Sequence, residues 1–333
     1  MTSVVLSAPW PNKPGAYKVG KYLGKGATGV VHAALCKPRN ETCAIKTIKS
    51  KDILAKYAKT EIKVISRCDH PNILSYYTSF PVANQFCLVL KLLEGGSLFD
   101  IIRYKMKHND CVEGVFDEET IATVLYEVLK GLVYFHGIGH IHRDIKAGNI
   151  LVGRDGTIQI SDFGSATYLS PQATDQHVKL YDYAGTAWYM APEMVKSETG
   201  HDFKIDIWSL GITAIAMATG HPPYYSESSA IATLATIMHP PPTLDTVHGA
   251  KGKFSCYGTT FTSMISDCLQ KDPDRRPTAL VLLKHPFFAQ AKNKKYLVEK
   301  LVAFSPFKAT RNYNSVPASN CIDADSSDSN DDT

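Results

Sequence analysis

The chain has 333 residues, of which 44% are hydrophobic and 20% are charged, a composition typical of a soluble globular protein. Its net charge of +4 is small for this length and its basic residues are scattered, so neither nucleic acid nor a membrane surface is favoured as the main partner. No apolar run is long enough to span a bilayer, the start has no charged signal-peptide region, and the eight cysteines form no CxxC pair. We therefore expect a reduced, cytoplasmic protein with no membrane span and no nucleic-acid partner.

The first predicted elements are a lead-in and a hairpin. Residues 1–16 contain several prolines without a period, and we expect them to be flexible. Strand-like alternation from Tyr17 to Leu23 meets the glycine-rich stretch 24–29, and a second strand-like run follows at 30–35. Since a strand rather than a helix follows the glycines, the pattern indicates a hairpin tip that can close over phosphates. A purely structural hairpin stays an alternative, as does, more distantly, a dehydrogenase that uses the glycine loop.

A lysine, Lys46, lies within the third predicted strand, residues 42–48. A lysine that points inward from a strand is costly unless an acidic group pairs with it. The candidate partner is Glu61, in a predicted helix over 53–68 that has apolar residues near one face. The pair would hold Lys46 against the α- and β-phosphates of a nucleotide. Alternatively, Glu61 belongs to a solvated, lysine-rich face of that helix.

Two more strands are predicted at 74–80 and 86–92, and the sequence Glu-Gly-Gly at 94–96 then breaks the pattern. We interpret this break as a hinge into a second domain. An adenine ring is expected to bond the backbone of residues 91–93, with Leu90 at the back of its pocket.

The chain beyond the hinge has the periodicity of helices. The polar stretch 105–114 is predicted to be a surface loop, and Asp117 is the predicted N-cap of an amphipathic helix that ends near Gly137. Residues 205–219 are apolar on nearly all sides, which predicts a central buried helix. The second domain is therefore expected to be larger and mainly helical.

Polar groups suited to phosphoryl transfer occur in the stretch 141–149 and soon after it. Asp144 can accept the proton of an incoming hydroxyl. Asn149 and Asp162 offer hard oxygen ligands of the kind that Mg²⁺ prefers, leaving other coordination positions to phosphates and water. Lys146 can neutralise charge on the moving phosphoryl group. Together these residues predict a magnesium-nucleotide phosphotransfer site.

Two further charged residues are interpreted as scaffold. Asp206, near the start of the apolar helix, needs a partner, and the backbone of the stretch 141–149 is the candidate. Arg276 is a good bidentate partner for Glu193.

Short motifs occur in a fixed order across residues 17–290. They are Gly24-x-Gly26-x-x-Gly29-x-Val31, Ala44-Ile45-Lys46, Glu61, His142-Arg143-Asp144, Asn149, Asp162-Phe163-Gly164, Ala191-Pro192-Glu193, Asp206 and Arg276. In this order and spacing they resemble the eukaryotic protein kinases, and Lys146 with Gly185-Thr186 is similar to the serine/threonine kinases.

Longer sequence motifs make the resemblance more specific. They are His70-Pro71-Asn72-Ile73, Tyr76-Tyr77-Thr78-Ser79-Phe80, Lys91-Leu92-Leu93-x-Gly95-Gly96-Ser97, Ile145-Lys146-Ala147-Gly148-Asn149 and Phe203-Lys204-x-Asp206-Ile207-Trp208-Ser209. These motifs resemble those of the STE group and, within it, of the Fray and oxidative-stress-responsive branch of germinal-centre kinases.

The resemblance implies a bilobal α+β fold with a β-rich N-lobe at 17–94 and a helical C-lobe at 95–290. From Ser315 onward the composition is polar and acidic, which predicts that the extension at 291–333 ends in a disordered acidic tail. It implies ATP and Mg²⁺ as cofactors and transfer of the γ-phosphate to serine or threonine hydroxyls of proteins. The branch is activated by with-no-lysine kinases, so we expect such an upstream partner and a role in stress or ion-homeostasis signalling. The alternative is a catalytically weak kinase fold that binds and activates a partner.

The residues and the resemblance together define a predicted site. The catalytic residues are Asp144, Lys146, Asn149 and Thr186, and the metal ligands are Asn149 and Asp162. The residues expected to surround the nucleotide are Leu23, Gly24, Gly26, Gly29, Val31, Ala44, Lys46, Glu61, Leu90, Lys91, Leu93, Leu151 and Asp162.

Two departures from the branch concern residues 182–187. The branch usually carries a phosphorylated threonine where this chain has Asp182, and its Gly-Thr-Pro is replaced by a Gly-Thr-Ala that ends at Ala187. In this family Arg143 faces the phosphorylated residue, so we hypothesise that Asp182 supplies part of the missing negative charge. The alternative is a solvated loop aspartate.

Overall fold

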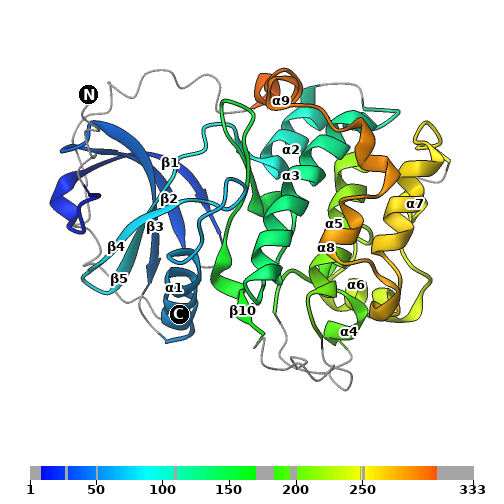
Figure 1. Ribbon diagram of the computed structural model, residues 1–333, viewed down its shortest axis with the longest axis horizontal. Coiled ribbons are helices and arrows are strands. Elements are labelled where there is room, and N and C mark those ends of the chain that lie inside the picture. Colours follow the sequence, from blue (N-terminus) through cyan, green and yellow to red (C-terminus); the bar gives the residue numbers. More distant parts are fainter. Residues whose placement is uncertain are drawn as a thin grey trace, which may run out of the picture.

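The computed structural model describes residues 9–26, 29–49, 52–108, 111–169, 184–195, 201–247, 249 and 252–305. Strands gather in one lobe and helices in the other, so the predicted bilobal α+β fold is confirmed (Figure 1).

The N-lobe is built on an antiparallel five-stranded sheet with the strand order β1-β2-β3-β5-β4. Its strands are β1 (Tyr17–Lys25), β2 (Val30–Cys36), β3 (Glu41–Lys49), β4 (Tyr76–Val82) and β5 (Gln85–Leu90). Each begins and ends within a few residues of its predicted range. The glycine-rich stretch lies between the paired strands β1 and β2, as a hairpin tip requires.

The N-terminal segment packs on this sheet earlier than expected. Trp10 stacks on Tyr77 of β4, with ring centroids 4.1 Å apart, and the guanidinium of Arg39 lies 4.7 Å from the Trp10 ring centroid. The Tyr17 hydroxyl donates to the Pro11 carbonyl. The lead-in that the sequence predicted to be flexible is therefore packed on the sheet at Trp10, while residues 12–15 are exposed.

Helix α1 (Asp52–Ile65) lies between β3 and β4 in the chain and is the only helix labelled in the N-lobe in Figure 1. It buries Ala58, Val64 and Ile65 together with Glu61. The helix ends three residues before the predicted end at residue 68, because the chain turns there over Ser66–Cys68.

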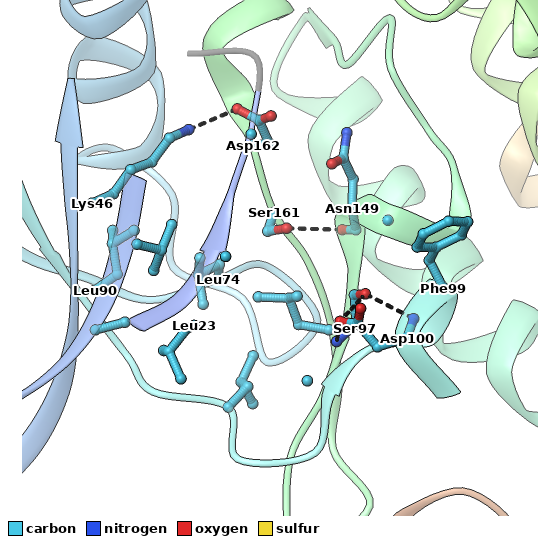
Figure 2. A pocket seen from close by; sticks show the side chains of 18 of the residues that line it. Leu23, Lys46, Leu74, Leu90, Ser97, Phe99, Asp100, Asn149, Ser161 and Asp162 are labelled. Carbon is cyan, nitrogen blue, oxygen red and sulfur yellow. Dashed lines mark hydrogen bonds and ion pairs between the residues drawn. The ribbon is translucent and has the colours of Figure 1, made fainter. Parts of the chain in front are cut away.

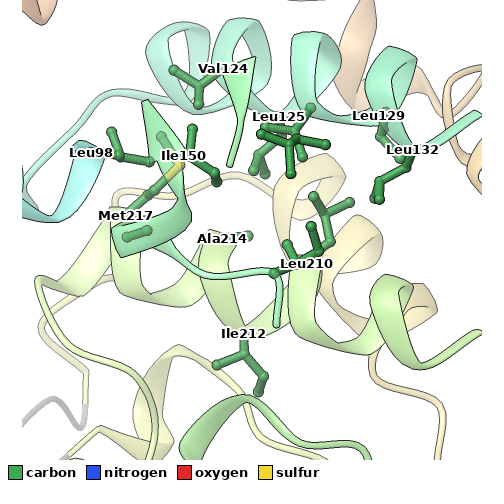
Figure 3. Close-up of a cluster of buried hydrophobic side chains, with 14 of the residues drawn as sticks. Leu98, Val124, Leu125, Leu129, Leu132, Ile150, Leu210, Ile212, Ala214 and Met217 are labelled. Atoms are coloured by element: carbon green, nitrogen blue, oxygen red, sulfur yellow. The ribbon is translucent and has the colours of Figure 1, made fainter. Parts of the chain in front are cut away.

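The C-lobe is mainly helical, as predicted. Its helices are α2 (Leu98–His108), α3 (Glu118–Gly137), α4 (Pro192–Val195), α5 (Lys204–Thr219), α6 (Ser229–Met238), α7 (Thr259–Cys268), α8 (Ala279–Leu282) and α9 (Lys294–Lys300). Every residue of α5 after Lys204 is buried, which confirms the central buried helix. In Figure 3, Leu125 and Leu129 of α3 point toward α5, which carries Leu210 and Ala214.

The surface loop predicted to begin at residue 105 was wrong in its first four residues, because α2 continues to His108. Ser97 and Asp100 form the reciprocal bonds of a capping box at the start of α2: the Asp100 amide donates to Ser97 Oγ at 3.1 Å, and the Ser97 amide donates to Asp100 Oδ2 at 3.2 Å. Ile101 and Ile102 are fully buried and attach the helix to the core.

Two small sheets frame the loops between the lobes. One has the order β6 (Gly96–Ser97), β8 (Ile150–Val152), β9 (Ile158–Ile160), and the other pairs β7 (His140–Ile141) with β10 (Thr167–Tyr168). The segments 142–149 and 161–166 leave these strands, so their polar side chains are placed by short, paired backbone on both sides. In the part of the chain that the structure describes, each helix is too short or too polar to cross a bilayer.

Candidate active site

A cleft of about 980 Å³ lies between the lobes. Every residue that the sequence assigned to the nucleotide, to the metal or to catalysis lines this cleft. Figure 2 shows Lys46 and Asp162 facing each other across it, with Asn149 beside them. The predicted residues are therefore brought together, although they come from segments far apart in the chain.

The side chain of Lys46 is at the centre of a buried charge cluster. Its Nζ lies 2.8 Å from both carboxylate oxygens of Glu61 and 2.8 Å from Oδ1 of Asp162. Glu61 is 1% exposed, so the alternative of a solvated carboxylate on the surface of α1 is wrong. Burial by itself would lower the pKa of Lys46, but the two carboxylates outweigh it and hold that pKa above the usual lysine value, which keeps the ammonium charged.

Asp162 adopts a left-handed backbone conformation, with φ of 63°, which a residue with a Cβ rarely takes up. Phe163 next to it is fully buried and packs edge-to-face against His142. Burial raises the pKa of the Asp162 carboxyl, but the Lys46 charge more than compensates and holds that pKa below its usual range. The strained backbone thus presents an ionised carboxylate to the cleft.

Two backbone groups of the hinge, one carbonyl and one amide, are available to bond a ligand. The Lys91 amide donates to the Ser75 carbonyl at 2.9 Å, and the Leu93 carbonyl accepts from the Gly96 amide at 3.2 Å. Within the described residues, the Lys91 carbonyl and the Leu93 amide make no hydrogen bond. They form an acceptor and donor pair beside Leu90, which is 4% exposed. Apolar side chains form the walls of the cleft on either side: Leu23, Val31, Ala44, Leu74 and Leu151.

Asp144 accepts hydrogen bonds on both carboxylate oxygens. Its Oδ1 takes the Thr186 hydroxyl at 2.7 Å, and its Oδ2 takes Lys146 Nζ at 2.6 Å and Asn149 Nδ2 at 2.9 Å. Lys146 Nζ also donates to the Thr186 hydroxyl oxygen at 2.6 Å. A carboxylate, an ammonium and a hydroxyl are thus in mutual contact at the mouth of the cleft.

Gly185 allows Thr186 to reach Asp144. Its φ is +107°, in the region that favours glycine, and a Cβ there would lie 2.4 Å from the Arg143 carbonyl oxygen. Any side chain at this position would push the segment 184–187 away from the loop that carries Asp144.

Asp206 of helix α5 holds the backbone next to Asp144 through hydrogen bonds. Asp206, which is fully buried, accepts hydrogen bonds from the amides of His142 at 2.9 Å and Arg143 at 2.8 Å, and from His136 Nε2 at 2.8 Å. Burial raises the pKa of Asp206, but the His136 bond and the nearby imidazoles outweigh it and leave that pKa lowered. This confirms the predicted partner of Asp206, and it places this residue in the scaffold.

The predicted pair of Arg276 and Glu193 is also present. Arg276 Nη1 donates to Glu193 Oε1 at 2.5 Å and Nη2 donates to Oε2 at 2.7 Å, with both side chains buried. This bidentate pair joins the segment after Thr186 to the segment after α7.

The sequence proposed two regulatory residues, Arg143 and Asp182, and the structure describes the first of them. Arg143 has a φ of +68° and its Nε donates to the Ser165 carbonyl at 2.6 Å. Asp182, for which the sequence suggested a pairing with Arg143, lies outside the described residues.

The cleft also has lining residues that the sequence did not point to. They are Ser97, Phe99, Asp100, Arg154, Val298, Val302 and Ser305, among others. Ser97 and Asp100 carried a readable signal, because S-x-x-D before an apolar run is a capping-box pattern. Val298, Val302 and Ser305 carried no sequence signal of a place in the cleft.

Comparison with known proteins agrees with this geometry. The family model described as "Protein kinase domain" matches residues 17–288. Germinal center kinase 3 of Caenorhabditis elegans is 48% identical over 301 residues, which cover 88% of this chain and 50% of that protein. Serine/threonine-protein kinase fray2 of Dictyostelium discoideum is 38% identical over 89% of this chain and 28% of its own length, and fray1 is 36% identical over 88% and 49%.

The chain spans about half, or less, of the length of these curated relatives. Their names agree with the branch that the sequence motifs indicated. Because the kinase-domain model covers most of the chain and includes both lobes, the chain belongs to the protein kinase family, among relatives named as germinal center and Fray kinases.

Proposed function

We propose that the protein is an ATP-dependent serine/threonine kinase, which transfers the γ-phosphate of ATP to serine or threonine hydroxyls of proteins. The observation that carries the proposal is the contact of Asp144, Lys146 and Thr186 at the mouth of a cleft whose inner end holds Lys46, paired with Glu61 and Asp162. The names of two relatives, which include "Serine/threonine-protein kinase", support it.

The nucleotide is placed by groups along the cleft. The Lys91 carbonyl and the Leu93 amide would bond the adenine edge, and the apolar walls would cover its faces. Lys46, charged and held by Glu61, would contact the α- and β-phosphates. Gly24, Gly26 and Gly29 of the β1–β2 hairpin also line the cleft and would approach the phosphates through their backbone.

The residues also fit a magnesium ion. Among the described residues, no group of three or more His, Cys, Asp and Glu side chains could hold a metal alone, so phosphate oxygens would complete the coordination. The amide nitrogen of Asn149 is committed to Asp144, which leaves its oxygen as a ligand. Asp162 uses Oδ1 for Lys46 and retains Oδ2. When bound, the ion would neutralise negative charge on the phosphates.

The chemical step needs a base and a compensating charge. The hydroxyl oxygen of the substrate bonds to the γ-phosphorus as the bond from phosphorus to the leaving oxygen of ADP breaks, and the hydroxyl proton passes to Asp144. Lys146 stabilises the negative charge on the transferred group. Thr186 holds the Asp144 carboxylate in orientation through Oδ1.

A phosphate-transfer assay with radiolabelled ATP and a basic generic protein substrate tests the proposal. Asp144→Ala should lower turnover by about 10²–10⁴-fold while ATP still binds, because the base does not touch the adenine or hinge. Asp274→Ala, a change of an exposed aspartate far from the cleft, is the control. A wild-type chain that binds ATP but transfers no phosphate would instead favour the catalytically weak scaffold.

The cellular setting belongs to the same proposal. The resemblance to the Fray branch supports a cytoplasmic enzyme in stress or ion-homeostasis signalling, with a with-no-lysine-type kinase upstream. The position of Asp182 in the sequence supports a reduced need for that activator. If phosphatase-treated protein is inactive, or Asp182→Ala keeps full activity, the role of Asp182 is disproved.

A further inference from the structure

The segment 292–305, here called the C-terminal strap, is attached firmly to the C-lobe. It comprises α9 and the short 3-10 turn Val302–Phe304, and α9 lies over α2 and α3 in Figure 1. Leu297 and Leu301 are fully buried in the main core. Lys300 Nζ lies 2.9 Å from Asp117 Oδ2 at the start of α3. The strap is thus part of the folded kinase unit.

The strap passes very close to the turn between β8 and β9. Gly156 in this turn has a φ of +80°, and a Cβ there would lie 2.2 Å from the Lys294 carbonyl oxygen. Lys294 Nζ donates to the Thr157 hydroxyl at 3.1 Å. The turn therefore accommodates the strap backbone only because residue 156 has no side chain.

A lysine between two aromatic rings holds the far end of the strap. Lys105 Nζ lies 4.7 Å from the Phe116 ring centroid and 4.9 Å from that of Phe304. Burial lowers the pKa of Lys105. The cation–π contacts connect the last turn of α2 to the strap, next to the hinge.

The strap ends on the hinge itself. The Ser305 hydroxyl donates to the Gly95 carbonyl at 2.9 Å, and Ser305 is 5% exposed. The Gly95 amide donates to the Val152 carbonyl at 2.8 Å, so Gly95 is held through both its amide and its carbonyl. Val298, Val302 and Ser305 line the same cleft as Lys46 and Asp144.

We propose that the C-terminal strap is the outer wall of the nucleotide site and that Ser305 is a positioning residue, which fixes the hinge backbone through the Gly95 carbonyl. The inference rests on the proposed function, since it assumes that a nucleotide occupies the cleft. A hinge already held in its binding geometry costs less to order when the nucleotide binds. The buried Ser305–Gly95 bond, with the two valines beside it, supplies this ordering.

Removing the hydroxyl tests the role of Ser305. In Ser305→Ala the Gly95 carbonyl loses its buried donor, and we expect the Kd for ATP and for ADP, measured by titration calorimetry, to rise about two- to fivefold. The KM for a peptide substrate and the turnover at saturating ATP should stay unchanged, because Asp144 and Lys146 are not touched. Lys105→Met should raise the Kd in the same direction, and Lys295→Ala, on the exposed side of α9, should not change it.

A second measurement does not need a nucleotide. Amide hydrogen exchange of residues 93–97 in the free protein should be faster in Ser305→Ala than in the wild type, with melting temperatures showing that both are folded. If the wild type binds ATP while Ser305→Ala shows an unchanged Kd, the role of the strap is overturned and the proposed function stands. If the wild type binds no ATP, the proposed function fails, and the exchange rates alone show whether Ser305 orders the hinge.

Discussion

At Lys46, burial and charge pairing act in opposite directions on one side chain. The ammonium has little contact with water, which costs free energy, and it is retained because Glu61 and Asp162 both lie 2.8 Å away. The two carboxylates come from different lobes. The Lys46 ammonium therefore joins helix α1 of the N-lobe to the C-lobe segment that carries Asp162.

At the residue scale, we predict that Glu61→Gln lowers kcat/KM for ATP by about ten- to a hundredfold, since it removes a hydrogen bond to a charged partner worth about 1.5–3 kcal/mol. Glutamine keeps the shape of the side chain and one acceptor, so the melting temperature should change little. Steady-state kinetics with varied ATP measures the effect. Lys63→Gln, on the exposed face of the same helix, is the control, and an unchanged kcat/KM in Glu61→Gln would contradict the positioning of Lys46 by Glu61.

The start of α3 shows how a local signal acquires a distant partner. Asp117 caps the helix through the Thr120 amide at 2.8 Å, as the sequence predicted. The same carboxylate also binds Lys300 at 2.9 Å and the Tyr296 hydroxyl at 3.1 Å, both from α9. Burial raises the pKa of Asp117, but the bonds to Thr120 and Lys300 outweigh it and lower that pKa to about 2.

At the element scale, Asp117→Asn should keep the cap but lose the attraction to Lys300, which costs at most about 1 kcal/mol of the free energy of unfolding because the pair is partly exposed. The folded pKa lies below the unfolded value of about 3.9, so the charge stabilises the fold above about pH 4 and this contribution is lost as the pH falls toward 2. Urea unfolding of both proteins at about pH 6 and about pH 3 measures it. A stability difference that is equally large at both pH values would show that the charge is not responsible.

Across the whole molecule, buried charges join segments that the chain keeps far apart. Arg276 pairs with Glu193 and donates through Nε to the Gln270 carbonyl at 2.6 Å. Its guanidinium carbon lies 5.0 Å from the ring centroid of Trp208 in α5. One fully buried side chain therefore links three parts of the C-lobe.

At this scale, Arg276→Met should lower the free energy of unfolding by about 3–5 kcal/mol, because it leaves the Glu193 carboxylate buried and unpaired. The double variant Arg276→Met with Glu193→Gln should recover part of that loss, since the buried charge is then gone. Equilibrium unfolding in urea of the two single variants, the double variant and the wild type gives the coupling. Strictly additive losses would mean that the pair does not act as a unit.

The parts of the fold that could be predicted have a strong local pattern. Apolar spacing identified α3 and α5, and alternation identified the strands of the N-lobe within a few residues. The predicted surface loop overlapped the last turn of α2 because the sequence at 105–108 is mostly polar. That turn is stabilised by Lys105, which lies between two aromatic rings; one of them, Phe304, is about 200 residues further along the chain.

The sequence by itself determined which chemical groups the site contains, because Asp144, Lys146, Asn149 and Asp162 occur in short motifs whose spacing is local. Only the tertiary structure decided their distances, such as that between Lys46 and Asp162, which are 116 positions apart, and it alone added Ser305, 210 positions from Gly95. The physical reason is that a long-range contact must overcome the entropy of closing the chain, and the packing of whole elements supplies that free energy. Local propensity and hydrophobic periodicity extend over a few turns or strands and carry no record of which distant segment completes the cleft.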